Sequence, residues 1–349
     1  MSDHHTLDDK TILVTGGTGS FGQQFIKRVL ADYAPRKIIV FSRDELKQFE
    51  MQQRYPTKKY PTLRYFIGDV RDRDRLYRAF KDVDVVVHAA AMKQVPACEY
   101  NPVEAVKTNI MGAANVIDAA IDCGVPQVLA LSSDKAANPL NLYGASKLCS
   151  DKLFVAGNFY SGVRQTRFSI VRYGNVLGSR GSVIPFFLKK RKEGVLPITD
   201  ERMTRFWITL DQAVDFVLQS LQRMRGGEVF VPKLPSMRIT DLAKAIAPEC
   251  ELRIVGIRAG EKLHEVMIPE DDARSSLEFD DQYVILPTHY DEPFEVYFGE
   301  KTAHRCADGF RYSSDNNARW LTLDELRALV VNLEVDQRGS AAELGTVQS

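Results

Sequence analysis

The sequence predicts an α/β protein built on a doubly wound parallel sheet, with a second, smaller α/β domain. Short β-branched apolar runs alternate with helical patterns through the first half of the chain, as in successive βαβ units. A glycine-rich turn follows the first of these runs, and the regular alternation ends after Arg172. These observations favour one large sheet domain followed by a smaller domain in which strands and helices no longer alternate regularly.

Six apolar runs are expected to form the sheet, namely Thr11–Thr15, Lys37–Phe41, Leu63–Ile67, Asp84–His88, Gln127–Leu131 and Phe168–Arg172. Helices are expected between them at Ser20–Tyr33, Asp44–Arg54 and at about 72–80, 100–123 and 143–159. Such strands, with helices on both sides, are buried on both faces.

The region after Arg172 predicts helices at Asp211–Met224 and Ile239–Ile246, with a last helix opening at Thr322. Glu325 follows that threonine at capping-box spacing. We expect residues 1–174 to form a dinucleotide-binding domain, to which residues of about 206–230 also belong. Residues 175–335 would mainly bind substrate, and residues 336–349 would be a disordered tail.

Composition points to a small-molecule ligand. The 349 residues are 44% hydrophobic, and 46 basic residues balance 46 acidic ones, so no charge excess favours nucleic acid or an anionic membrane. The five cysteines show no metal-ligand spacing, so we expect no zinc site. The polar N-terminus and the lack of a long apolar window predict a cytoplasmic protein without membrane segments.

The glycine-rich turn at residues 16–22 predicts a pyrophosphate site between strand and helix. The expected contacts are Gly16, Thr18, Gly19, Ser20, Phe21 and Gly22. The G-x-x-G-x-x-G spacing resembles that of the short-chain dehydrogenase/reductase superfamily, which implies a Rossmann fold and a nicotinamide cofactor. A merely tight turn is the alternative.

The end of the second strand favours NADP over NAD. An NAD enzyme would place a carboxylate there, whereas this chain has Ser42 and Arg43, which can hold a 2′-phosphate. Arg43 could instead be an ordinary surface charge, and the nearby Asp44 weighs against NADP. Further expected cofactor contacts are Lys47, Asp69, Val70, Ala89, Ala90, Lys93, Tyr143 and Lys147.

Residues 132–147, SSDKAANPLNLYGASK, carry the predicted chemistry. Tyr143 and Lys147 lie four apart on one helix face, where an ammonium and the oxidised nicotinamide would lower the pKa of the phenol. Ser133 ends the preceding strand and can bond the same substrate hydroxyl. Asp134 and Lys135 add an acid and a base. The sugar-nucleotide dehydratases of the superfamily that the chain resembles carry such a pair at the same strand end, and this resemblance implies removal of water from a hexose.

The chain resembles the soluble, configuration-inverting UDP-N-acetylglucosamine 4,6-dehydratases of the pseudaminic acid pathway from about Leu7 to Val335. The matching segments are residues 16–22, 42–47, 68–72, 93–96, 99–102, 108–112, 132–147, 172–176, 202–207 and 260–265. In the related dTDP-glucose dehydratases the catalytic pair is typically Asp-Glu, whereas here Lys135 follows Asp134.

The resemblance implies a substrate, UDP-N-acetylglucosamine, and a role for each residue of the stretch. Tyr143, assisted by Lys147 and Ser133, would take the proton of the C4 hydroxyl. Lys135 would remove the C5 proton, and Asp134 would protonate the leaving C6 hydroxyl. If Lys135 only pairs with Asp134, the base must lie elsewhere.

The expected substrate contacts are Lys93, Asn175, Arg205, Arg258 and Glu261, any of which could instead be structural. The family is commonly multimeric, so a homo-oligomer is expected. A UDP-sugar 4-epimerase, a retaining dehydratase and an NADP sensor without turnover remain alternatives.

Overall fold

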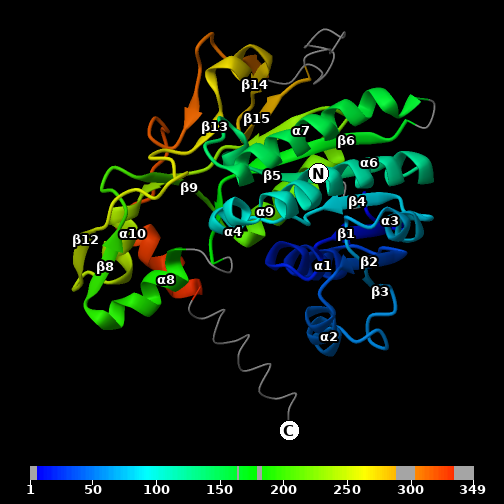
Figure 1. The fold of residues 1–349 in the computed structure, drawn as a ribbon, viewed down its shortest axis with the longest axis horizontal. Helices are drawn as coiled ribbons and strands as arrows, with labels where there is room; N and C mark the ends of the chain where they lie inside the picture. Colours follow the sequence, from blue (N-terminus) through cyan, green and yellow to red (C-terminus); the bar gives the residue numbers. More distant parts are fainter. Residues whose placement is uncertain (1–5, 163–164, 179–182, 288–302, 334–349) are drawn as a thin grey trace. The chain divides into compact units, whose positions relative to one another are not determined.

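The computed structural model describes residues 6–162, 165–178, 183–287 and 303–333, and its ribbon is shown in Figure 1. The chain divides into two compact units. Unit 1 contains residues 1–173, 211–233 and 267–311, and unit 2 contains residues 174–210, 234–266 and 312–349. The expected tail, 336–349, lies outside the described residues.

The sheet of unit 1 confirms the predicted doubly wound arrangement. Its parallel strands are β1 (Thr11–Thr15), β2 (Lys37–Ser42), β3 (Leu63–Ile67), β4 (Val85–His88), β5 (Gln127–Ser133) and β6 (Arg167–Tyr173), in the order β3-β2-β1-β4-β5-β6. The order reverses between β1 and β4, and ligands of such sheets bind outside the carboxyl ends of the strands at this point.

Four further strands extend this sheet beyond β6. They are β10 (Val229–Pro232), β15 (Gln282–Ile285), β14 (Ser276–Glu278) and β16 (His304–Arg305). We expected residues 267–311 in the second domain, but β15 pairs antiparallel with β10 and so brings this segment into unit 1. The free edge of β10 accounts for the difference, because an unpaired edge strand readily accepts another strand.

Helices cover both faces of the sheet (Figure 1). They are α1 (Ser20–Asp32), α2 (Glu45–Arg54), α3 (Arg73–Phe80), α4 (Val95–Tyr100), α5 (Pro102–Ala105), α6 (Gly112–Cys123), α7 (Leu142–Tyr160) and α9 (Leu210–Arg223). The short 3₁₀ helices η2 (Asp134–Ala136) and η5 (Glu270–Ser275) also belong to this unit. Helix α6 packs between α3 and α7, whereas α1 contacts α9 through the ion pair of Arg28 with Asp215.

The single helix expected at about 100–123 is wrong in detail. Pro102 begins the short helix α5, and a π-helical segment, η1 (Val106–Met111), separates α5 from α6. The side chain of Asn109, inside η1, holds both backbone polar groups of Met92 at 2.8 and 2.9 Å. A local widening of the helix that serves one side chain in this way is typical of π-bulges.

Unit 2 is smaller and has its own core. Its elements are β7 (Asn175–Val176), α8 (Val183–Lys190), η4 (Arg191–Glu193), β8 (Val195–Ile198), β9 (Thr204–Ile208), β11 (Ser236–Arg238), α10 (Ile239–Ile246), β12 (Glu251–Ile254) and β17 (Tyr312–Ser313). The first residue of β13 (Val266–Ile268) belongs to unit 2 and the other two belong to unit 1. Phe187, Ile198, Trp207 and Leu242 are buried together in this core.

The last helix, residues 323–333, begins as predicted. The amide of Thr322 donates to Glu325 Oε2 at 2.8 Å, and the amide of Glu325 donates to Thr322 Oγ1 at 3.3 Å. These reciprocal bonds form the expected capping box. Throughout the described part of the chain, no helix combines the length and the apolar character needed to span a bilayer.

Candidate active site

The glycine-rich turn joins β1 to α1. Gly16 has a φ of +67°, and a Cβ on it would lie 2.9 Å from the amide nitrogen of Ala90. Only glycine fits both conditions. Gly19, the N-cap of α1, has no side chain to bond the first-turn amides, so these amides can receive a phosphate. Ala89 and Ala90 donate their amides to Thr15 Oγ1, each at 3.2 Å, which fixes the neighbouring loop.

Polar groups gather at the carboxyl end of β2. Ser42 Oγ and Thr18 Oγ1 lie 2.8 Å apart, which joins this strand end to the glycine-rich turn. Arg43 is 59% exposed in its side chain and lies 3.6 Å from Asp69 Oδ2. Arg71 holds the same carboxylate at 2.7 Å. The guanidinium of Arg43, the residue after Ser42 in the sequence, is therefore largely exposed to solvent.

Asp44, the acidic residue that weighed against NADP, serves helix α2. Its Oδ1 accepts the amide of Lys47 at 3.0 Å, and its Oδ2 pairs with Lys47 Nζ at 2.6 Å. The side-chain and backbone bonds from Lys47 lower the pKa of Asp44. The carboxylate is thus occupied as a helix cap.

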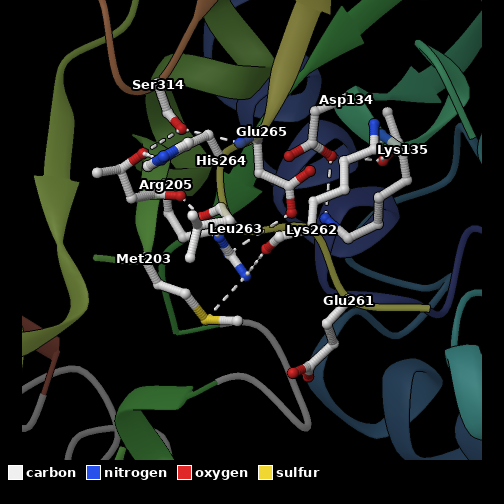
Figure 2. A network of polar contacts seen from close by, with 12 residues as sticks. Asp134, Lys135, Met203, Arg205, Glu261, Lys262, Leu263, His264, Glu265 and Ser314 are labelled. Atoms are coloured by element: carbon white, nitrogen blue, oxygen red, sulfur yellow. Dashed lines mark hydrogen bonds and ion pairs between the residues drawn. The ribbon is translucent and has the colours of Figure 1, made fainter. Parts of the chain in front are cut away.

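Ser133, Asp134 and Lys135 form a compact cluster where β5 ends in η2. Ser133 Oγ donates to Asp134 Oδ1 at 2.8 Å, and Lys135 Nζ donates to the same oxygen at 3.0 Å (Figure 2). The side chain of Asp134 is 1% exposed and that of Lys135 25%. Asp134 Oδ2 is buried and receives no hydrogen bond from any residue that the structure describes. A buried oxygen of this kind suits a hydroxyl of a bound substrate.

Helix α7 packs closely against this cluster. A Cβ on Gly144 would lie 2.2 Å from the backbone oxygen of Lys135, so no larger residue fits without a shift of the backbone. Asn141 caps the helix by accepting the amide of Gly144 at 2.8 Å. Tyr143, which precedes this glycine, is thereby fixed beside η2.

The phenol of Tyr143 is buried, and burial is the main reason that its pKa rises to about 12. The positive charge of Lys135 and a hydrogen bond with Ser133 act in the opposite direction. The sequence led us to expect Lys147 as the cation that lowers this pKa. In the structure Lys135 acts on the phenol, because η2 lies directly against the start of α7, and the role of Lys147 stays a prediction.

Lys147 is 3% exposed and lies on α7 one turn after Tyr143. Burial lowers the pKa of its ammonium, and the carboxylate of Asp151 opposes this effect. Behind it lies His88, whose pKa burial lowers to about 3, with Lys147 adding to the effect. His88 Nδ1 bonds Thr15 Oγ1 at 2.8 Å, so this imidazole is neutral and structural.

Lys93 and Val70 complete the expected set in unit 1. Burial lowers the pKa of Lys93, and the residue before it, Met92, is fixed by Asn109. Val70 is buried, and a Cβ on Gly112 would lie 2.8 Å from its Cγ2. Phe21 stacks on Phe25 with ring centroids 5.9 Å apart.

In unit 2 the expected substrate residues fall into separate groups. Arg205 donates to the backbone oxygens of Leu263 and Lys262, both at 3.1 Å, and its Nε lies 3.5 Å from Glu265 Oε1 (Figure 2). Its guanidinium therefore helps to hold the segment before β13. The side chains of Arg258 and Glu261 pair at 3.7 Å. Asn175 begins β7, where it pairs with Trp207 of β9.

Sequence reasoning missed two buried residues of unit 1, Asn109 and Asp151. Asn109 also donates to Ser146 Oγ at 2.9 Å and so ties η1 to α7. Asp151 follows Lys147 by four residues in the sequence. This spacing places both side chains on one face of a helix, so the sequence alone could have indicated Asp151. The described residues contain no cluster of His, Cys, Asp and Glu suited to a metal ion.

Comparisons with known proteins agree with this fold. The profile of the family described as "Polysaccharide biosynthesis protein" matches residues 12–287. A UDP-N-acetylglucosamine 4,6-dehydratase (inverting) of Campylobacter jejuni is 57% identical over 335 residues, which are 94% of this chain and 99% of that protein. A UDP-glucose 4-epimerase of Rickettsia conorii is 40% identical, over 94% of this chain and 97% of that protein.

Two solved structures are also similar. Pen from Bacillus thuringiensis superposes with a TM-score of 0.85 at 37% identity, covering 94% of this chain and 99% of that one. DesIV, a dTDP-glucose 4,6-dehydratase from Streptomyces venezuelae solved with NAD and TYD bound, superposes with a TM-score of 0.65 at 25% identity. That match covers 72% of this chain and 86% of the other.

Proposed function

The chain belongs to the polysaccharide biosynthesis protein family and to its branch of inverting UDP-N-acetylglucosamine 4,6-dehydratases, and from this membership we propose that it catalyses that reaction. The product is UDP-2-acetamido-2,6-dideoxy-β-L-arabino-hexos-4-ulose. The observation that carries the proposal is the Asp134–Lys135 pair, hydrogen-bonded at 3.0 Å beside Tyr143. A dehydrogenase needs only Ser133, Tyr143 and Lys147, whereas elimination of water also needs this acid and base.

NADP is the proposed cofactor. The turn at residues 16–22 suits a pyrophosphate, because Gly16 lets the backbone approach closely and the first amides of α1 have no side-chain cap. The hydroxyl of Ser42 and the exposed guanidinium of Arg43 suit a 2′-phosphate, with Lys47 one turn further on. Asp44 does not oppose this assignment, since its carboxylate caps α2.

Oxidation at C4 begins with Tyr143, which takes the proton of the C4 hydroxyl. A nicotinamide cofactor, which the turn at residues 16–22 would hold, would supply the hydride chemistry for oxidation at C4 and reduction at C6. Burial is the main reason that the pKa of the phenol lies at about 12 even with Lys135 nearby, so the base needs further positive charge to ionise. Lys135 acts on the phenol directly, and Lys147 lies one helical turn away.

Elimination follows because a C4 ketone makes the C5 proton acidic. Before this step a proton passes from Lys135 to Asp134 across the 3.0 Å bond between Nζ and Oδ1. Lys135, now the neutral amine, removes the C5 proton, and Asp134, now the neutral acid, gives its proton to the C6 hydroxyl as water leaves. The pair thereby passes from neutral amine and acid to ammonium and carboxylate, with no change in its total charge. The 3.0 Å bond between Nζ and Oδ1 allows a proton to return to Asp134 for the next turnover.

The proposed substrate contacts follow from the chemistry of the residues. Lys93 and the buried Oδ2 of Asp134, which receives no hydrogen bond from the described residues, are suited to bond sugar hydroxyls. Arg258 and Glu261 suit the phosphates and the ribose, while Asn175 and Arg205 are the remaining candidates. A proton from solvent then adds to C5 on the face opposite Lys135, which inverts the configuration at that carbon, and Tyr143 releases the proton that it took from the C4 hydroxyl.

The biological setting is proposed from the resemblance alone. The reaction would be the first step toward pseudaminic acid, in the cytoplasm, by a homo-oligomer. The finished sugar would be transferred to flagellin or to a surface polysaccharide.

A UDP-sugar 4-epimerase is the second candidate, because the Rickettsia relative of that name is 40% identical over nearly the whole chain. An epimerase shares the C4 oxidation but returns the hydride to C4. A retaining dehydratase and an NADP sensor without turnover are less favoured, because Tyr143 and the complete catalytic stretch are present.

The test is turnover of UDP-N-acetylglucosamine in deuterated water, with the product examined by mass spectrometry and NMR. We expect loss of water, deuterium at C5 and the L-arabino configuration. A product of unchanged mass with only C4 inverted would assign the chain to the epimerases. Retained configuration at C5 would indicate a retaining dehydratase, and absence of any product would favour the sensor.

A further inference from the structure

An open pocket lies within unit 2. Its volume is about 640 Å³, and every residue that lines it belongs to this unit. Pockets of this size are large enough for a nucleotide. None of the lining residues belongs to the catalytic stretch at residues 132–147 or to the expected cofactor and substrate contacts. The proposed reaction therefore gives this pocket no role.

Helix α10 contributes two cations to the pocket. Arg238 is the N-cap residue of the helix, and Lys244 lies in its last turn. Both residues are exposed, and neither side chain forms a hydrogen bond or an ion pair with any residue that the structure describes. A third cation, Arg202, is neutralised by Asp200, whose carboxylate oxygens it bonds at 2.8 and 3.0 Å. Arg238 and Lys244 thus present positive charge that suits the oxygens of a phosphate.

Trp320 supplies an aromatic ring whose orientation is fixed. Its Nε1 donates to the backbone oxygen of Asn317 at 2.7 Å. The residues on either side of Trp320 are bonded to the backbone of Ser236, each at 2.8 Å. The guanidinium of Arg238 lies 5.7 Å from the centroid of the ring. An aromatic ring held beside a cation suits a nucleotide, because a base stacks on the ring while the cation binds phosphate.

His264 lines the same pocket from the segment before β13. Its Nδ1 lies 2.8 Å from Thr204 Oγ1, which in turn lies 2.6 Å from Ser314 Oγ (Figure 2). Thr204 and Ser314 are both buried, so these bonds anchor one side of the imidazole. The other ring nitrogen, Nε2, bonds none of the described residues, and it can therefore bond an oxygen of a ligand.

The pocket also contains carboxylates, which argue against a site for inorganic anions alone. Glu201 is exposed and pairs with no cation among the described residues. Asp315 accepts a hydrogen bond from the hydroxyl of Ser313 at 2.5 Å. Carboxylates repel phosphate, but they bond the hydroxyls of a ribose in many nucleotide sites. A ligand that carries both a ribose and phosphates uses charges of both signs.

We propose that this pocket binds a nucleoside diphosphate, with the base on Trp320, the phosphates on Arg238 and Lys244, and the ribose hydroxyls on Glu201. His264 Nε2 provides a further bond to a phosphate oxygen. The site is additional to the cofactor and substrate contacts proposed above, and binding there involves no covalent step. The inference does not depend on the proposed reaction, because it is tested by binding without turnover.

The test is titration of the full chain with ADP and with UDP, followed by tryptophan fluorescence. The chain has two tryptophans, and the other one, Trp207, is buried in the core of unit 2. We expect saturable quenching that Trp320→Phe abolishes. Lys244→Ala should weaken binding at least about tenfold, whereas Lys192→Ala, which changes an exposed lysine of unit 2 outside the pocket, should not. Absence of saturable quenching, or equal affinity of Lys244→Ala and wild type, would overturn the proposal.

Inorganic pyrophosphate separates a nucleotide site from a general anion site. We expect it to displace ADP only at concentrations at least about tenfold above those of ADP itself. Glu201→Gln should weaken the binding of ADP but not that of pyrophosphate, because only ADP has a ribose. Equal affinities for ADP and pyrophosphate would reduce the pocket to an anion site and overturn the proposal.

A last comparison identifies the source of the ligand. Tighter binding of UDP than of UDP-N-acetylglucosamine at Trp320 would support a site for the free nucleotide, and the reverse order would support a site for a nucleotide sugar. Glu201 and Lys244 are exposed and bond none of the described residues. Their variants should therefore keep the thermal midpoint of wild type, so that a loss of binding reports on the pocket itself.

Discussion

Replacing Gly144 by alanine should impair catalysis although alanine is the better helix former. The added Cβ would lie 2.2 Å from the backbone oxygen of Lys135, and ordinary contact begins at 3.4 Å, so α7 and η2 must separate by about 1.2 Å. Alanine gains about 1 kcal/mol of helix propensity, which overpacking of about 1–3 kcal/mol offsets or exceeds. A displacement of this size between Tyr143 and Lys135 is expected to lower kcat about a hundredfold.

The assay measures kcat for dehydration together with the thermal midpoint and the cofactor Kd. Gly157→Ala is the matched control, because it makes the same change in the same helix. Its Cβ would meet side-chain atoms of Ile117 and Phe168 at 3.1 Å, and its kcat should remain within about twofold of wild type. A Gly144→Ala enzyme with wild-type kcat would refute the idea that this close approach sets the geometry of the site.

Three further predictions concern the base, the cofactor and acid stability. Lys135→Ala should abolish dehydration while the cofactor Kd stays unchanged, and near-normal turnover would exclude Lys135 as the base. Arg43→Ala combined with Lys47→Ala should lower affinity for NADP relative to NAD at least about tenfold, measured by fluorescence titration, whereas the surface variant Lys58→Ala should not. The pKa of His88 falls from 6.5 in the unfolded chain to about 3 in the folded protein, so below pH 6.5 the unfolded chain binds a proton that the folded protein does not. The contribution of His88 to the free energy of unfolding is therefore complete above pH 6.5. It declines by up to about 1.4 kcal/mol per pH unit as the pH falls toward 3. The thermal midpoint of wild type should therefore fall more steeply between pH 7 and pH 5 than that of His88→Gln, and equal slopes would contradict the assignment.

Much of unit 1 could be predicted because its signals are local. Each of the first six strands is a short apolar run, and the glycine turn and the stretch 132–147 follow strands directly. The capping box at Thr322 is likewise contained within four residues. Features of this kind depend on neighbours in the sequence, which a single chain displays.

The remaining features depend on contacts between distant segments. Nothing near residues 282–285 indicates that they pair with β10, because an antiparallel edge partner is chosen by the folded sheet. The π-helical segment at 106–111 reflects the bonds between Asn109 and Met92, 17 residues apart.

The candidate site also depends on contacts between distant segments. The sequence placed Lys147 near Tyr143 by helical spacing, but it did not indicate that Lys135, which another element brings there, also acts on the phenol. Arg205 was expected to contact the substrate, and the sequence did not indicate that it also bonds the backbone oxygens of Lys262 and Leu263. Residue type indicated the chemistry in both cases, whereas the partner was set by tertiary packing.

The central claim is that a single site oxidises C4 and then reduces C6 of the same sugar. The most direct measurement uses UDP-N-acetylglucosamine carrying deuterium at C4, with the position of the label in the product read by NMR. The account predicts that the deuterium lies at C6 of a product that has lost water. Deuterium that remains at C4, or label found in released cofactor, would contradict it.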